Sequence, residues 1–452
     1  MKEENRKYAE EAYEIVNDAA TKIGSRLPGS DGETKFHRYM MDKLRAIGIT
    51  PKEEEFAVSP RSGIGGLSYA GWAGFIISIA CLFALELPTL WFGVAFFSCL
   101  AIFWLIFSCF LYKTWFDMFF PQEISRNSYG VLEPEDGKYD YTIILSGHTD
   151  TSWCWRHSEH AYKYKDKPII GIIATYGKVG FGAVCFFFIT LASIFMAVVQ
   201  AITLIKGAND FAFASFLSNP IYTRFVTAMH FIPLITALGC WFVIMWGDPN
   251  GRNASRGAMD NATGIALSYE VIKYFKENPD KMPKNCRIVD LNVGSEESGL
   301  RGSMFFAQEH KNDDLTKNAW NINIDSVADK DYFEVVIKDD WQGCRFDTDM
   351  EKMFKDTFNE LNIPSKSKDH CIHNPVGGCD STPMTRAGIK SVTFAAQNPM
   401  LTYYYHTWRD MPRRFEMETV GNGFDVVLGV IDKIAAFQEA NGYNGPQKKA
   451  KK

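Results

Sequence analysis

Six places along this chain carry acidic or imidazole side chains at points where predicted strands or loops end. They are His148, Asp150, Asp260, the pair Glu296 and Glu297, Asp325, and His406. Carboxylate and imidazole groups without a cysteine among them suit zinc or a similar divalent ion that keeps open coordination positions. We therefore predict a catalytic metal centre in which two ions are held, and not a structural one.

The first candidate ligand follows a short apolar run. Residues 142–145 are β-branched or apolar and lead into Gly147, His148, Thr149 and Asp150. This pattern predicts a buried strand that delivers a histidine at its carboxyl end. Because ligating histidines usually donate their second N–H to a nearby carboxylate or carbonyl, we expect Asp150 to orient His148.

Two further predicted strands end in carboxylates. Residues 287–293 are a second predicted strand, and Glu296 and Glu297 follow before a helix predicted over 304–310. Adjacent carboxylates point in different directions, so one can bind a metal while the other carries a proton. Residues 320–324 are a third strand that ends at Asp325. Because ligands bind outside the carboxyl ends of parallel strands, these ends are expected to converge.

The remaining candidates lie beside a helix and in an aromatic loop. Residues 257–264 precede a predicted amphipathic helix, which places Asp260 at a helix N-terminus, where the macrodipole favours its ionised form. A carboxylate there is well placed to bridge two ions. His406 lies in the aromatic segment 403–410, after a strand predicted over 391–395.

These blocks resemble, in the same order, the clan MH zinc exopeptidases, which include bacterial leucyl aminopeptidase and glutamate carboxypeptidase. The shared motifs are His-x-Asp at 148–150, Gly-x-x-Asp-Asn-Ala-Thr-Gly at 257–264, Glu-Glu-x-Gly-Leu-x-Gly-Ser at 296–303, the strand-end Asp325, and His406-Thr407. The opening segment 26–33 resembles the start of the same family.

The resemblance implies roles for each motif residue. His148 and Asp325 would hold one ion, Glu297 and His406 the other, and Asp260 would bridge them. Glu296 would be the general base. The family's Ser-Asp-His near the specificity pocket reads Cys-Asp-Ser at 379–381 here, which leaves the oxyanion donor unassigned. Tyrosines 403–405 are candidates for that donor or simply form an aromatic packing loop.

Four long apolar runs indicate a membrane protein. Residues 62–85 and 87–112 carry no charge, and residues 179–205 and 225–247 contain His230 as their one ionisable group. Each run reaches the length of about 20 residues that a membrane-spanning helix needs. Tryptophans near the predicted ends suit the membrane interface; they are Trp72, Trp91, Trp115, Trp241 and Trp246. Buried core helices of a large soluble enzyme are the alternative.

Two helical hairpins would leave all soluble segments on one side of the membrane. That side carries most of the flanking basic residues, namely Arg61, Lys113, Lys163, Lys165, Lys167, Lys178 and Arg252, against Lys206 and Arg224 opposite. The positive-inside bias places the catalytic part in the cytoplasm. No cleavable signal sequence is predicted at the charged start, and ten cysteines without paired spacing favour a reducing compartment.

We predict a three-layer α/β/α domain with a mixed, largely parallel sheet, interrupted by the two hairpins. Its peptidase parts are 1–61, 113–177 and 248–440, the hairpins are 62–112 and 178–247, and a lysine-rich polar tail follows at 441–452. The start is an amphipathic helix, and a helix over 426–437 closes the domain. A net charge of -5 and the lack of basic clusters outside the tail argue against a nucleic-acid partner.

Three functions remain open on these grounds. The first is a membrane-anchored zinc exopeptidase, most of all an aminopeptidase, that acts on peptides including apolar or membrane-associated ones. The second is another amide hydrolase, or a glutaminyl-cyclase-like enzyme, on the same fold. The third is a receptor or transporter with a vestigial peptidase domain, which the near absence of charges in the spans disfavours.

Overall fold

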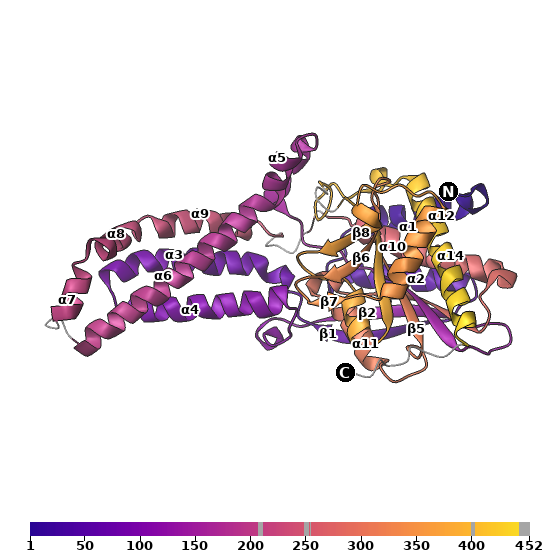
Figure 1. Cartoon of the computed structure of the whole chain (residues 1–452), viewed down its shortest axis with the longest axis horizontal. Helices are drawn as coiled ribbons and strands as arrows, with labels where there is room; N and C mark the ends of the chain where they lie inside the picture. Colours follow the sequence, from indigo (N-terminus) through magenta and orange to yellow (C-terminus); the bar gives the residue numbers. More distant parts are fainter. Residues whose placement is uncertain (207–210, 248–252, 254, 399–402, 443–452) are drawn as a thin grey trace.

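The chain folds into an α/β domain joined to an elongated bundle of apolar helices (Figure 1). This computed structural model describes residues 1–206, 211–247, 253, 255–398 and 403–442. Arg252 and most of the lysine-rich tail, both singled out in the sequence, lie outside the described residues.

The α/β domain is built on one nine-stranded sheet in the order β1-β2-β4-β3-β5-β9-β6-β7, with β8 paired to β6. Four central strands are parallel, namely β4 (Cys286–Val293), β3 (Tyr141–His148), β5 (Ala319–Val327) and β9 (Lys390–Ala396). Antiparallel strands flank them, namely β1 (Pro51–Val58) and β2 (Glu123–Leu132) on one side, and β6 (Phe333–Asp339) and β7 (Cys344–Arg345) on the other. Strand β8 (Cys371–Asn374) runs parallel to β6. The predicted mixed sheet is confirmed, with its parallel part at the centre.

Helices cover both faces of this sheet, because alternate residues of its buried strands point to opposite sides. In β3, Ile143 and Leu145 face one core and Ile144 faces the other. The larger core is covered by α1 (Arg6–Asp18), α2 (Asp31–Ala46), α10 (Thr263–Glu277), α12 (Thr348–Glu360) and α14 (Met417–Ala440). The smaller is covered by α11 (Arg301–Glu309) and α13 (Ser381–Arg386). The domain therefore has the predicted three layers.

The bundle contains four helical stretches that are long and apolar enough to cross a membrane, at Ile64–Glu86, Leu90–Phe110, Pro168–Lys206 and Pro220–Ile244. Their main helices are α3 (Leu67–Glu86), α4 (Leu90–Trp104), α6 (Lys178–Lys206) and α9 (Ile232–Ile244). Large apolar side chains on their outer surface stay exposed, and Phe83 and Phe96 are each 62% exposed. A surface of this kind suits hydrocarbon and not water.

Three details of the bundle differ from the sequence-based expectation. The third stretch begins at Pro168, with α5 (Pro168–Ile172) and a π-helical turn at Ile173–Gly177, ten residues before the predicted start of the hairpin at 178. The fourth stretch is divided into α8 (Pro220–Ala228) and α9, with Pro233 at the start of the second helix. Trp91 and Trp246, expected at the membrane interface, are buried inside the protein.

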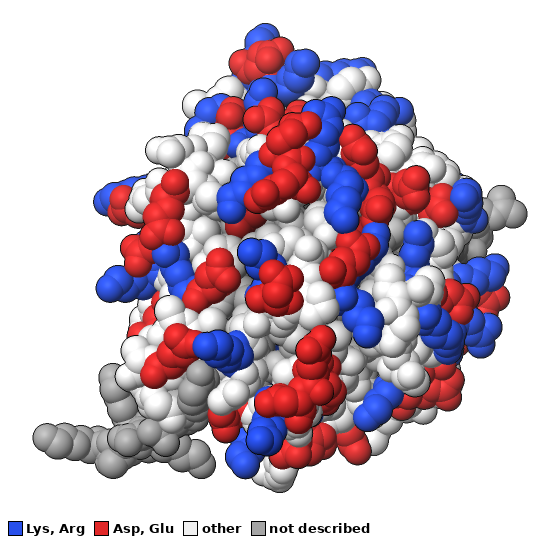
Figure 2. Space-filling model, turned by 90° about the vertical axis from the view of Figure 1, so that its right-hand side faces the viewer, with Lys and Arg blue, Asp and Glu red and all other residues white. Residues whose placement is uncertain are grey.

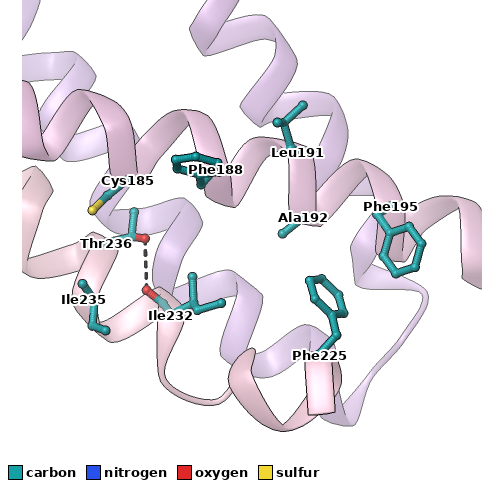
Figure 3. Close-up of a pocket in the computed structure, with 9 residues that line it drawn as sticks. All are labelled: Cys185, Phe188, Leu191, Ala192, Phe195, Phe225, Ile232, Ile235 and Thr236. Carbon is teal, nitrogen blue, oxygen red and sulfur yellow. Dashed lines mark hydrogen bonds between the residues drawn. The ribbon is translucent and has the colours of Figure 1, made fainter. Parts of the chain in front are cut away.

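An open groove of about 500 Å³ lies on the outer side of the bundle between α6 and the α8–α9 segment (Figure 3). Phe188, Leu191 and Ala192 line it from α6, and Phe225 and Ile232 line it from the other side. The Thr236 hydroxyl donates to the Ile232 carbonyl oxygen, as is usual for a threonine inside an apolar helix. This outer groove is separate from the catalytic domain.

The surface farthest from the bundle carries intermingled acidic and basic side chains (Figure 2). No area of a single sign dominates the face in view, in keeping with the modest net charge of -5.

Close helix crossings in the bundle depend on glycine. A Cβ atom added at Gly182 of α6 would lie 2.5 Å from the Gly239 carbonyl oxygen of α9, whereas one added at Gly180 would meet nothing within 4 Å. We expect Gly182→Ala to lower the free energy of unfolding by about 1–3 kcal/mol through overpacking. Thermal unfolding in detergent should show this loss for Gly182→Ala and not for the control Gly180→Ala. Equal unfolding temperatures of the two variants would contradict the close contact between α6 and α9 at Gly182.

Candidate metal centre

The predicted ligands come together as two groups that share one carboxylate. His148, Asp260 and Asp325 form one group, and Asp260, Glu297 and His406 form the other. Asp260 Oδ1 lies 3.2 Å from His148 Nε2, and Asp260 Oδ2 lies 3.0 Å from His406 Nε2. The two oxygens of one carboxylate thus face different groups, which is the arrangement that a bridging ligand requires.

Neighbouring parallel strands position two of these ligands, and the predicted strand end is confirmed for His148 but wrong for Asp325. His148 is the last residue of β3, and Asp325 lies in the neighbouring parallel strand β5. Asp325 is not at the end of its strand, because β5 continues to Val327 through a bulge after Asp325. His148 Nε2 lies 3.8 Å from Asp325 Oδ1. The bulge redirects the chain at the point where this carboxylate enters the site.

The turn before α10 holds Asp260 through its neighbour Asn261. The Asn261 side-chain amide donates to the Ile324 carbonyl oxygen and its oxygen accepts from Ser326 N–H, so it clamps this turn to the bulge of β5. Asp260 itself is outside the regular helix, which begins at Thr263. Gly264 fits against β5 because an added Cβ would lie 2.2 Å from the Ile324 carbonyl oxygen.

Asp150 fixes the turn that carries Glu296 and Glu297. Its carboxylate oxygens accept hydrogen bonds from Glu296 N–H and Glu297 N–H, at 3.0 and 2.9 Å. The expected link to His148 is looser, with His148 Nδ1 3.2 Å from the Asp150 carbonyl oxygen and 3.5 Å from its Oδ1. Asp150 is therefore a positioning residue that joins the end of β3 to the acidic turn.

His406 reaches the site from a loop packed with aromatic rings. Its Nε2 lies 2.9 Å from Glu297 Oε1, and its ring stacks on Tyr405 with 3.7 Å between centroids. Trp155 packs edge-on against the imidazole and donates its backbone N–H to the His406 carbonyl oxygen. Of the three tyrosines considered as oxyanion donors, Tyr404 donates to Asp329, and Tyr403 accepts from Arg414. Tyr405 lines the cavity at the site.

Three buried charged residues that support the site were missed by the sequence analysis. The Arg26 guanidinium donates to the carbonyl oxygens of Thr149, Arg256 and Gly257, which ties the end of β3 to the turn before α10. Glu33 accepts from Ser295 N–H, next to the acidic turn. Asp410 accepts from Met259 N–H and Asp260 N–H. Arg26 and Glu33 lie in the opening segment 26–33, and its family resemblance was the signal that could have identified them.

Substitution of Asp410 tests whether these buried residues hold the metal ligands in place. Asp410→Ala leaves two buried N–H groups of the Asp260 turn without their partner, so we expect metal affinity to fall about 10- to 100-fold. The matched control is Asp347→Ala, which removes a carboxylate that caps α12 by accepting from two N–H groups far from the site. It should lower stability by about 1 kcal/mol and leave metal affinity unchanged. Equal metal affinities in the two variants would contradict the role of Asp410.

The electrostatics of the site fit bound cations. Burial lowers the pKa of His406, but the Glu297 and Asp260 carboxylates outweigh this effect and raise it to about 9. Burial would raise the pKa of Asp260, yet the two imidazoles hold it below its ordinary value. His406 Nε2 lies 3.0 Å from Asp260 Oδ2 and 2.9 Å from Glu297 Oε1. Carboxylate oxygens and imidazole nitrogens are ligand atoms for divalent cations, and a cation can replace the proton that these groups share, so the residues present fit a metal centre.

Comparisons with known proteins agree with this geometry. Residues 244–431 match Peptidase family M28, a range that includes Asp260, Glu296, Glu297, Asp325 and His406 but not His148. No curated protein matches the chain by sequence.

Solved structures show the same fold at low sequence identity. BSAP, a zinc aminopeptidase from Bacillus subtilis, has a TM-score of 0.52 and 14% identity over 98% of this chain and 96% of its own. Glutaminyl cyclase from Bacteroides thetaiotaomicron, bound to N-acetylhistamine, has a TM-score of 0.51 and 14% identity over 94% and 97%. A leucine aminopeptidase precursor from the same organism has a TM-score of 0.50 and 13% identity over 94% and 96%.

A mixed sheet with carboxylate and imidazole groups gathered beside its parallel strands has the zinc exopeptidase fold. Within that class, residues 244–431 match Peptidase family M28, and the chain is a zinc metallopeptidase. The predicted membership of the zinc exopeptidases is confirmed.

Proposed function

We propose that the chain is a membrane-anchored exopeptidase with two divalent ions, expected to be zinc, and that it acts as an aminopeptidase. The observation that carries this proposal is the shared carboxylate of Asp260, whose two oxygens face two separate ligand groups. The complete second group, with Glu297 and His406, favours paired ions over a single one.

Glu296 is the proposed general base. Bound divalent cations supply a water molecule of lowered pKa and polarise the carbonyl group of the scissile amide. Glu296 is half-buried and lines the same cavity as the ligands, so it can accept a proton from that water molecule and return it to the leaving nitrogen. Burial raises the pKa of Glu296 above its ordinary value, with the His148 imidazole opposing this effect. A raised pKa strengthens the carboxylate as a base near neutral pH.

Peptides with free and blocked amino termini test the aminopeptidase proposal. We expect the metal-loaded protein to cleave a leucyl peptide one residue from its free end, and acetylation of the amino group to abolish cleavage. Cleavage of the acetylated peptide at its carboxyl end would overturn aminopeptidase action. Because solved cyclases share the fold, a peptide that begins with glutamine is included, and its cyclisation without hydrolysis of any peptide would favour the alternative activity.

The membrane proposal places the catalytic domain in the cytoplasm with four spans. It is supported by the four apolar stretches and by basic residues at the bundle end nearest the domain, such as Arg61 and Lys178. Fluorescent protein fused after the last helix should fluoresce inside the cell, whereas alkaline phosphatase fused there should be inactive. An active phosphatase fusion would reverse the orientation, and recovery of the chain in the soluble fraction would remove the anchoring.

A further inference from the structure

One continuous cavity of about 790 Å³ joins the metal centre to the interior of the helical bundle. At one end it is lined by the candidate ligands and Glu296. At the other end it is lined by side chains from all four main stretches of the bundle, among them Ala70, Ile102, Ile106, Ala183, Phe187 and Val243. The cavity that contains the catalytic groups therefore continues into the helical bundle.

The cavity reaches well inside the apolar spans. Val179 and Phe187 both line it and lie on the same α-helix, α6. Eight residues of α-helix correspond to about 12 Å. This length is comparable with the thickness of about 15 Å of one leaflet of the hydrocarbon core.

The chemistry of this inner part suits an aliphatic chain. Over the described residues, no charged side chain of the bundle lines the cavity. Thr175, one of its polar residues, already donates its hydroxyl to the Gly171 carbonyl oxygen. The Nε1 atoms of Trp155 and Trp246, which have no hydrogen-bond partner in the part of the chain that the structure describes, lie at the metal-centre end, where Trp155 packs on His406. An extended peptide would bring backbone N–H and C=O groups that need partners in hydrocarbon, whereas an alkyl chain brings none.

The packing of the bundle also limits the width of an occupant. Helix α9 touches α3 at Gly71, where an added Cβ would lie 2.5 Å from Ile244 N, and touches α6 at Gly182 and Gly239. A fifth helix, about 10–12 Å across, does not fit between helices that approach so closely. A single narrow chain does.

We propose, on the basis of the proposed hydrolase function, that the substrate is a single-chain amphiphile whose amide bond lies next to one long alkyl chain. The chain occupies the cavity within the bundle, and the polar amide end reaches the metal centre. Hydrolysis adds water across the C–N bond, so that the acyl carbon gains a hydroxyl group and the nitrogen gains a hydrogen. The alkyl chain is carried by the amine, as in an aminoacyl alkylamide, because the proposed aminopeptidase needs a free amino group on the acyl side.

Two substrate series, leucine n-alkylamides and N-acyl-leucines with two to ten carbons, test this inference with the full chain in detergent. Each buried methylene contributes about 0.8 kcal/mol, so kcat/KM should rise about three- to four-fold per carbon in the alkylamide series. A rise in the N-acyl-leucine series instead would overturn the placement of the chain on the amine and count against aminopeptidase action. A flat response in both series while leucine anilide is cleaved would overturn the inference and leave the proposed function intact.

Matched variants separate the cavity from unspecific partition into detergent. Ala183→Phe fills the inner cavity, and Ala192→Phe makes the same change on the same helix in the outer groove (Figure 3). We expect Ala183→Phe to flatten the chain-length dependence and Ala192→Phe to keep it. Ile106→Phe, on the other hairpin, replaces Ala183→Phe if the latter does not fold. A slope unchanged in both cavity variants would overturn the inference.

A binding measurement keeps the inference testable if no substrate is cleaved. Calorimetry with leucine decylamide and the Glu296→Gln protein should show affinity that falls at least ten-fold when Ala183→Phe is added. If the wild-type protein cleaves none of the substrates but this binding pattern is found, the result counts against the proposed function and supports the cavity. Equal affinity with and without Ala183→Phe would count against the cavity.

Discussion

Glu296→Gln should lower kcat by about 10²- to 10⁴-fold, because the amide side chain cannot accept the proton that general base catalysis requires. Glu296 belongs to neither ligand group, so metal content should not change. KM should change little, since the substitution preserves the shape of the side chain. Initial rates and metal analysis of the same purified sample measure both quantities.

Glu309→Gln is the matched control for this substitution. Glu309 is exposed at the end of α11, downstream of the acidic turn. Its replacement should leave kcat and metal content at wild-type values. A Glu296→Gln protein that keeps its metals and turns over at the wild-type rate would show that another group carries the proton.

Asp260→Asn should remove most of the bound metal and reduce activity below detection. Each oxygen of Asp260 faces a different ligand group, and asparagine offers one oxygen and one N–H₂ donor in their place. A donor that points at a cation repels it, so both positions are weakened by this single substitution. Metal content per chain, measured after equilibration with a fixed free zinc concentration, gives the result.

Asp290→Asn is the control that removes a buried carboxylate outside both ligand groups. Asp290 is buried in β4, where Ser268 donates to it, and burial raises its pKa to about 6. Its replacement should leave the metal content unchanged. Two ions per chain in the Asp260→Asn protein would be incompatible with a bridging role.

The main elements of the site could be predicted because its ligands follow short apolar strands. The run 142–145 marks β3 and so places His148 at a strand end, and the same reasoning places the acidic turn after β4. Parallel pairing of β4, β3 and β5 then brings these ends together. The prediction that Asp325 ends its strand was wrong, because the bulge that extends β5 to Val327 has no clear sequence signal.

The supporting residues could not be predicted, because their contacts join distant segments. Arg26 reaches carbonyl oxygens more than a hundred positions away, and Asp410 supports a turn 150 residues before it. Nothing in the local sequence of either residue indicates those partners. Asp150 was expected to orient His148, but its carboxylate accepts hydrogen bonds from Glu296 N–H and Glu297 N–H. These partners are also distant in the sequence and could not be predicted.

The number of long apolar helical stretches in the bundle was predicted correctly, but their bounds and packing were not. Hydropathy identifies apolar runs, so it overlooked the first ten residues of the third stretch, which begins at Pro168 after a lysine-rich segment. Hydropathy also cannot distinguish a tryptophan at the interface from one inside the bundle, as at Trp91. The cavity that joins the bundle to the site depends on side chains from four helices and becomes visible only once these are packed.

Anomalous X-ray scattering at the zinc absorption edge, from crystals of the zinc-loaded protein, tests the central claim most directly. We expect two peaks about 3.5–4 Å apart. One should lie among His148, Asp260 and Asp325, and the other among Asp260, Glu297 and His406. No peak at these side chains, or zinc bound only elsewhere, would contradict the account.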